Sequence, residues 1–133
     1  MSGEEGRGSV MSYDSRIGVK VDGTDIIAVI AQPEYDSPTY NLGTMFRKCT
    51  GWDFKQSEWY SVAAVYPLIQ HGIAELIAYP EKYRKYEPDN GWGTVESAVH
   101  ALESLKQCID EIEDPNSWTG WNTIPKEHLW VAW

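Results

Sequence analysis

The spacing of apolar residues along the chain switches between the periods expected of strands and of helices. Residues 17–21 alternate between apolar and polar or small side chains, and a continuous apolar run covers residues 26–30. Asp22-Gly23 lies between them, and Asp-Gly between two such runs predicts a β-hairpin with a tight turn. Because the second run is apolar on both faces, we expect its strand to be central in the sheet or covered.

Apolar residues recur at helical spacing through the middle of the chain. A short helix is predicted to begin near Asn41, which can cap it, and to end at Gly51. A longer helix is predicted from Ser61 to about Ala78. Pro67 lies inside that pattern, and we expect it to kink the helix or delay its start.

A second pair of helices is predicted further along the chain. Proline opens a short helix over residues 80–86, and Thr94 caps the longest helix. The buried face of that longest helix is predicted to comprise Val95, Ala98, Val99, Leu102, Leu105, Ile109 and Ile112. A final strand is predicted from Leu129 to Trp133.

These elements predict an α+β fold, with a small antiparallel sheet made of the N-terminal hairpin and the C-terminal strand. Three to four helices would pack on that sheet. Residues 13–133 are expected to form a single domain, and the glycine- and serine-rich residues 1–12 a flexible leader. With about three strands, the sheet has open edges, and pairing between copies offers a route to a homo-oligomer.

The charge balance narrows the range of partners. The chain has 11 Lys and Arg against 20 Asp and Glu, for a formal net charge of −9. Such a surface repels phosphate backbones, so nucleic acid is not an expected partner. An acidic surface attracts basic proteins, mimics nucleic acid, or serves only to keep the protein dissolved. These alternatives stay open at the level of sequence.

The cysteines and the hydropathy pattern point to a cytoplasmic protein. Cys49 and Cys108 are too few for a disulfide framework, and both fall in predicted helices, so we expect reduced and packed thiols. No apolar run reaches the roughly 18 residues needed to cross a bilayer, and no membrane contact is expected. The N-terminus carries Glu4 and Glu5 rather than an apolar segment, which argues against a secretory signal.

Recognisable catalytic patterns are missing from the sequence. The histidines His71, His100 and His128 are far apart, and none has a metal-binding spacing. There is no nucleophile elbow, no Cys-x-x-Cys and no phosphate-binding loop of the Walker type. We therefore predict no cofactor, no metal and no catalytic residue. A small hydrolase or transferase with a carboxylate pair is a third alternative, because the acidic residues are plentiful.

The tryptophans and tyrosines give the strongest indication of function. The chain has seven Trp and eight Tyr, many beside glycines and turns, and rings at loop positions are typical of ligand or partner surfaces. The first candidate site is Asn90-Gly91-Trp92-Gly93-Thr94, where glycines allow close approach and the following helix offers free N–H groups. With Trp92 stacking on a base, this segment suits a nucleotide-type ligand. The alternative is a helix cap, with Trp92 packed at the edge of the core.

The second candidate site is the other helix start that has a glycine nearby. Tyr40 and Asn41 precede that helix, and Arg47 within it can fork onto a phosphate or carboxylate. The alternative for Arg47 is an ion pair with one of the acidic residues. Together the two segments predict one ligand-binding pocket.

A joint pattern of four short segments resembles a group of small proteins, encoded by bacteriophages and prophages, that has no assigned activity. The segments are Thr39-Tyr40-Asn41, Met45-Phe46-Arg47, Pro80-Glu81-Lys82-Tyr83 and Pro88-Asp89-Asn90-Gly91-Trp92-Gly93. The likeness covers roughly residues 39–112 and implies a phage accessory protein in the bacterial cytoplasm. By analogy, such proteins often counter host defence.

Two functional hypotheses follow. The first is a non-enzymatic phage protein that sequesters a small nucleotide-type ligand, such as a defence signal, at the two candidate segments. The second is an acidic inhibitor that uses its charged face and exposed rings to block a host protein. Either partner is compatible with the sequence.

Overall fold

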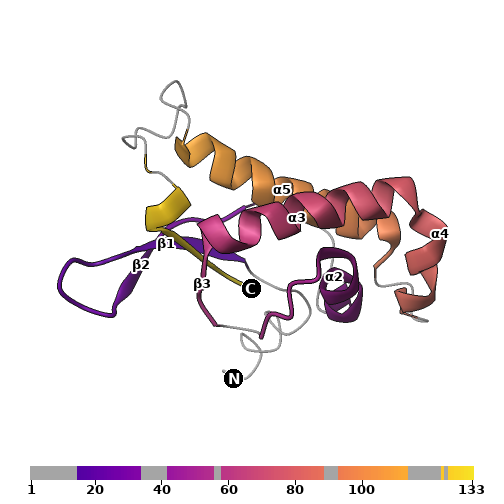
Figure 1. Cartoon of the computed structure of the whole chain (residues 1–133), viewed down its shortest axis with the longest axis horizontal. Helices are drawn as coiled ribbons and strands as arrows, with labels where there is room; N and C mark the ends of the chain where they lie inside the picture. Colours follow the sequence, from indigo (N-terminus) through magenta and orange to yellow (C-terminus); the bar gives the residue numbers. More distant parts are fainter. Residues whose placement is uncertain (1–14, 34–41, 56–57, 89–92, 114–123, 125) are drawn as a thin grey trace, which may run out of the picture.

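The computed structural model describes residues 15–33, 42–55, 58–88, 93–113, 124 and 126–133 (Figure 1). Their strands form one antiparallel sheet in the order β2-β1-β4-β3. The strands are β1 (Arg16–Lys20), β2 (Ile27–Ala31), β3 (Tyr60–Ser61) and β4 (Leu129–Ala132). The helices are α2 (Gly43–Thr50), α3 (Val62–Ala78), α4 (Pro80–Tyr83) and α5 (Val95–Glu113), with 3-10 turns η2 (Arg84–Tyr86) and η3 (Lys126–His128). The predicted α+β class is confirmed, and β3 is a strand that the sequence analysis missed.

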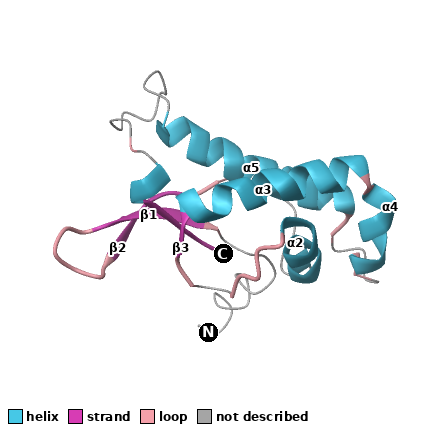
Figure 2. Cartoon of the chain, viewed as in Figure 1, coloured by secondary structure: helices cyan, strands magenta, loops and turns pink. Residues whose placement is uncertain are grey.

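The sheet buries one face against the helices. Ile17 of β1 and Leu129 and Val131 of β4 are fully buried, and α3 packs against β3 and β4. Figure 2 shows α3 and α5 running along one side of the sheet, while the β1–β2 hairpin projects beyond them. On the other face, Lys20 lies over the ring of Trp130 with its Nζ 4.7 Å from the ring centre. Alternate residues of β1 therefore face the buried side and the charged side of the sheet, as the sequence pattern predicts.

The prediction that the second strand is central or covered is wrong. β2 is an edge strand, which pairs with β1 alone among the described strands. Val29 in β2 is 48% exposed and Ile26 just before it is 64% exposed. The hairpin extends past the helical layer (Figure 1), so Ala28 and Val29 are exposed, whereas Ile30 and Ala31 pack against the core.

The hairpin connection is also longer than a two-residue turn. The N–H of Val21 donates to the carbonyl of Ile26, so four residues lie between the closing pair. Gly23 has a positive φ of 77°, as the Asp-Gly signal requires, and Thr24 N–H donates to the Val21 carbonyl. The Thr24 hydroxyl then accepts a hydrogen bond from Ile26 N–H. This side-chain contact delays the start of β2 to Ile27.

The predicted helices are confirmed to within a few residues. α3 follows Ser61 and contains Pro67 without a later start, α4 and η2 cover residues 80–86, and α5 follows Thr94. The predicted face of α5 is buried, with Val99 only partly so. α2 begins at Gly43, after Leu42 rather than Asn41, and Gly51 ends it with φ 75° and an N–H donated to the Arg47 carbonyl.

The core gathers four aromatic rings below the helices. Trp133 at the C-terminus stacks on Phe46 of α2 with ring centres 4.8 Å apart, and on Phe54 at 5.4 Å. Trp52 lies 6.1 Å from Trp133. Each of these rings is at most 4% exposed. Trp52 and Phe54, in the loop after α2, therefore belong to the core. They do not form the ligand surface that was predicted from aromatic residues at loop positions.

Candidate functional site

The structure brings the two predicted candidate segments together at the starts of α2 and α5. A Cβ placed on Gly93 would lie 2.9 Å from the side chain of Leu42, and Gly93 has a φ of +133°. Two features disfavour any side chain at position 93: the positive φ of the backbone and the close approach of Leu42. The contact is apolar packing, as the helix-cap alternative predicts for this segment. Tyr40, Asn41, Asn90, Gly91 and Trp92 lie outside the described residues.

The first turn of α5 already has acceptors for its N–H groups. Thr94 caps the helix as predicted, because its hydroxyl accepts a hydrogen bond of 3.0 Å from Ser97 N–H. The N–H of Val95 donates to the carboxylate of Glu87 at 2.8 Å. A carboxylate from the chain itself thus occupies the place where an anionic ligand would bind. A phosphate at this helix start would have to displace Glu87.

Arg84 of η2 joins three carboxylates around this helix start. Its guanidinium donates to Glu81, to Glu87 and to Glu96, with distances of 2.9–3.2 Å. The hydrogen bond from Arg84 lowers the pKa of Glu96 to about 2, with help from a backbone hydrogen bond. The same hydrogen bonds raise the pKa of Arg84. With Glu75, Lys82 and Lys85 included, four carboxylates face three cations at this end of the molecule, an excess of one negative charge.

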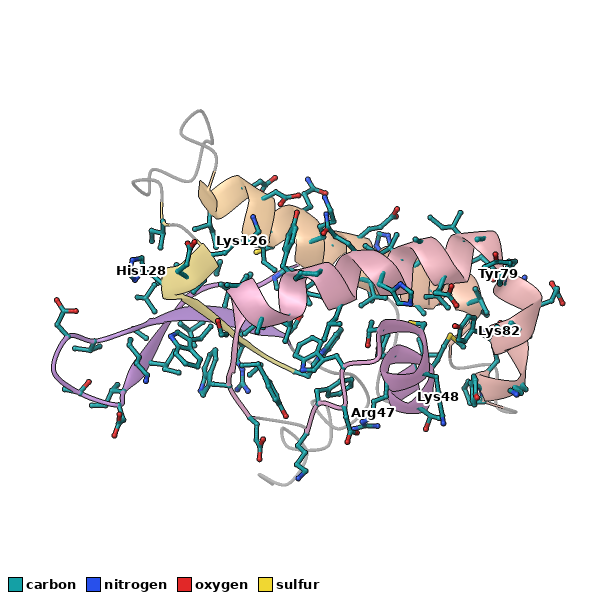
Figure 3. All side chains as sticks on the ribbon, in the orientation of Figure 1. Arg47, Lys48, Tyr79, Lys82, Lys126 and His128 are labelled. Carbon is teal, nitrogen blue, oxygen red and sulfur yellow. The ribbon has the colours of Figure 1, made fainter. Side chains whose placement is uncertain are left out.

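Arg47 contacts the loop that follows its own helix. Its Nε donates to the carbonyl of Phe54 at 3.0 Å, and its guanidinium carbon lies 4.4 Å from the centre of the Phe54 ring. Figure 3 shows Arg47 and Lys48 on α2, with Lys48 on the side of that helix nearer to Lys82. Arg47 thus ties α2 to the loop that follows it. The predicted ion pair does not occur among the described residues.

An apolar groove lies beside the carboxylate group. It has a volume of about 270 Å³ and is lined by Leu76, Ile77, Pro80, Val95, Glu96 and Val99. The groove runs between the end of α3 and the first turns of α5. Ile77 is 60% exposed, and Tyr79 next to it in the chain is 57% exposed. Large apolar side chains left open beside charged groups are typical of a contact surface.

A second, polar groove lies along the middle of α3 and α5. It has a volume of about 490 Å³ and is lined by Gln70, Ile73, Glu103, Lys106, Gln107 and Asp110. At one end, the Tyr66 hydroxyl and the Lys106 ammonium both donate to Asp110, at 2.5 and 2.8 Å. Burial and the bond to Asp110 raise the pKa of Tyr66. These groups satisfy one another, so they join the two helices rather than leave a reactive group open.

Groups that could support metal or thiol chemistry do not gather in the described part of the chain. No cluster of three His, Cys, Asp or Glu side chains there could hold a metal ion. His71, His100 and His128 are all exposed and lie on separate elements. Both cysteines are free, and burial raises the pKa of Cys49 to about 12 and that of Cys108 to about 11. Their thiols are poor nucleophiles at neutral pH.

Within the described ranges, no single helix is long and apolar enough to cross a bilayer. α3 passes that test only together with residues 80–86, and the two are bent by 106°.

The sequence analysis missed the residues that define this end of the molecule. Glu87 and Arg84 lie seven and ten residues before Thr94, and no local motif links them to the helix start. Ile77 belongs to a helical apolar pattern, yet it falls outside the buried stripe. Charge gave little signal, because residues 81–96 carry four Asp or Glu against three Lys or Arg.

No protein-family model, curated protein or solved structure matches this chain. The resemblance to phage proteins therefore stays a prediction, and the function has to be argued from the side chains described above.

Proposed function

We propose that the protein is an acidic, non-catalytic binding protein that acts by docking on another protein and blocking it. The observation that carries the proposal is the open apolar groove, marked by Ile77, with the exposed carboxylates of Glu81 and Glu96 beside it. An apolar centre with a charged rim is the usual make-up of a protein interface. The net charge of −9 favours a basic partner and speeds its approach.

Within this proposal, the partner is a bacterial host protein, and the binding protein is a phage accessory factor in the cytoplasm that counters defence. That part rests on the sequence resemblance alone. The rings of the four-ring core pack inside the protein and take no part in the proposed contact.

The test is capture of the partner from bacterial lysate on immobilised protein. We expect a stoichiometric partner whose retention falls steeply between low and high salt, because exposed charges are screened. An unrelated acidic protein of similar size is the control for non-specific charge. If the immobilised protein and the acidic control protein retain the same lysate proteins at every salt concentration, the proposed function is wrong.

A nucleotide-type ligand is the second candidate, and one observation favours it. Leu42 and Gly93 bring the starts of α2 and α5 into contact, and these are the two helix starts at which the sequence predicts the ligand. Calorimetry with a panel of cyclic and ADP-ribose nucleotides tests this candidate. Heat of binding that Trp92→Ala abolishes supports it, whereas no heat across the panel with folded protein removes it.

A further inference from the structure

We propose that the groove between the end of α3 and the start of α5 docks a basic, apolar segment of the partner. One apolar side chain of that segment enters the groove, and flanking lysines or arginines face the carboxylates beside it. This inference rests on the proposed function, because it names the surface and the chemistry of the partner that this function requires.

The shape of the groove suits a side-chain anchor. Leu76 and Val95 are 1% and 2% exposed and form the buried base, whereas Ile77 is 60% exposed at the edge. The volume of about 270 Å³ lies below the roughly 300–1,000 Å³ of pockets that hold whole small molecules. A leucine, isoleucine or phenylalanine anchor would cover Ile77 and remove its side chain from water.

The charges around the groove select a cationic segment. Glu96 lines the groove itself with its side chain 68% exposed, and Glu81 nearby is 82% exposed. Lys82 is paired with Glu75 at 3.4 Å, Arg84 is paired with three carboxylates, and Lys85 is exposed. These four carboxylates and three cations leave an excess of one negative charge, which adds to the net charge of −9 of the chain and favours a basic segment over an acidic one.

The position of the groove leaves it accessible. The α3–α4 junction, with Tyr79 and Lys82, lies at one end of the long axis of the molecule, and the β1–β2 hairpin projects from the other end (Figure 3). Tyr79 is 57% exposed and adds an amphipathic ring beside the groove. Tyrosines of this kind are enriched where proteins meet.

The experiment uses two synthetic 14-residue amphipathic peptides, one made of leucine and lysine and the other of leucine and glutamate. Fluorescence anisotropy measures their binding to the full-length protein and to three variants. Ile77→Ser and Glu96→Gln alter the groove, and Val29→Ser alters another exposed apolar residue, on the hairpin. All three sites are exposed, so the variants are expected to fold, with a small loss of stability in Glu96→Gln from the lost Arg84 contact.

We expect the lysine peptide to bind, and the glutamate peptide not to bind. Ile77→Ser should weaken binding about tenfold, since loss of the covered Ile77 surface removes over 1 kcal/mol. Glu96→Gln should weaken binding less and reduce its salt dependence. Equal binding of both peptides, or equal effects of Ile77→Ser and Val29→Ser, overturns the inference.

Two further results separate this inference from the proposed function. If a lysate partner is retained equally by the wild-type protein and by Ile77→Ser, the docking surface is elsewhere and the proposed function stands. Sedimentation at several protein concentrations tests whether a second copy of this chain occupies the groove. A dimer that Ile77→Ser dissolves would show that the groove serves self-association, and would contradict the choice of a basic partner.

Discussion

Two apolar regions of this protein are built from similar residues and differ in what covers them. The four-ring cluster of Phe46, Trp52, Phe54 and Trp133 is at most 4% exposed, whereas Ile77 and Tyr79 at the groove are 57–60% exposed. The cluster draws its rings from α2, the following loop and the C-terminus, which fold over one another. The groove is formed where α3 ends and the chain turns into α4, and Ile77 at its edge remains exposed.

The difference teaches which apolar residues stabilise the fold and which remain for partners. Burial of a side chain lowers the free energy of the folded state, while an exposed side chain contributes little until something covers it. Substitutions in the cluster should therefore change stability, and substitutions at the groove should change binding alone. The following predictions test that division, from the largest effect to the smallest.

Replacement of Trp133 by alanine should have the largest effect. Trp133 is 2% exposed and stacks on two rings, so Trp133→Ala should lower the free energy of unfolding by about 3–5 kcal/mol. Tyr79→Ala, at a 57% exposed ring, is the matched control and should change it by less than about 0.5 kcal/mol. Chemical denaturation measures both. Similar losses for the two variants would contradict the division between cluster and groove.

Gly93→Ala should have an intermediate effect at the contact between the two helix starts. Its φ of +133° and a Cβ position 2.9 Å from Leu42 combine backbone strain with overlap, and we expect a loss of about 1–3 kcal/mol. Gly51→Ala is the control, because Gly51 also has positive φ but open space around its Cβ position. Thermal unfolding should show a greater loss for Gly93→Ala. Equal losses would mean that Leu42 yields and that only the backbone conformation matters.

The smallest effect concerns the carboxylates beside the groove and depends on pH. Hydrogen bonds from Arg84 hold the pKa of Glu96 at about 2, below its ordinary value of 4.5. A carboxyl with a lowered pKa in the folded state stabilises the protein above pH 4.5, and that contribution is lost as the pH falls towards 2. Because Glu96 is 68% exposed, solvent screens the effect and keeps it small.

Denaturation between pH 2 and pH 6 compares the wild-type protein with Glu96→Gln. The variant should lose less stability over the acid range than the wild-type protein does. Glu103→Gln, at an exposed carboxyl without an ion pair among the described residues, is the control. If the wild-type protein and Glu96→Gln lose the same free energy of unfolding as the pH falls, the Arg84 contacts do not contribute to stability.

Local patterns were enough to predict most elements of this fold. Apolar spacing predicted α3 and α5 and both strands of the hairpin, and Gly51 and Thr94 marked a helix end and a helix start. Each of these features depends on neighbouring residues and on the backbone between them. The order of the strands does not, and the apolar run of β2 looked like a central strand although it lies at the edge.

The candidate site was predicted only in part, for a related reason. The two helix starts are in contact through Leu42 and Gly93, and the pocket itself stays a prediction. The groups that contact Val95 N–H and Arg47 are Glu87 and Phe54, which lie eight and seven residues away in the chain. No sequence motif indicates that these particular groups will make these contacts.

The sequence by itself determined the periodicity of the elements, the negative charge and the supply of aromatic rings, because these are properties of each residue and its near neighbours. The tertiary structure alone decided which rings became core, which edge stayed open and that Ile77 lies beside Glu96. Burial and ion pairing depend on what the rest of the chain places next to a residue. That placement is settled only when the helices and the sheet pack together.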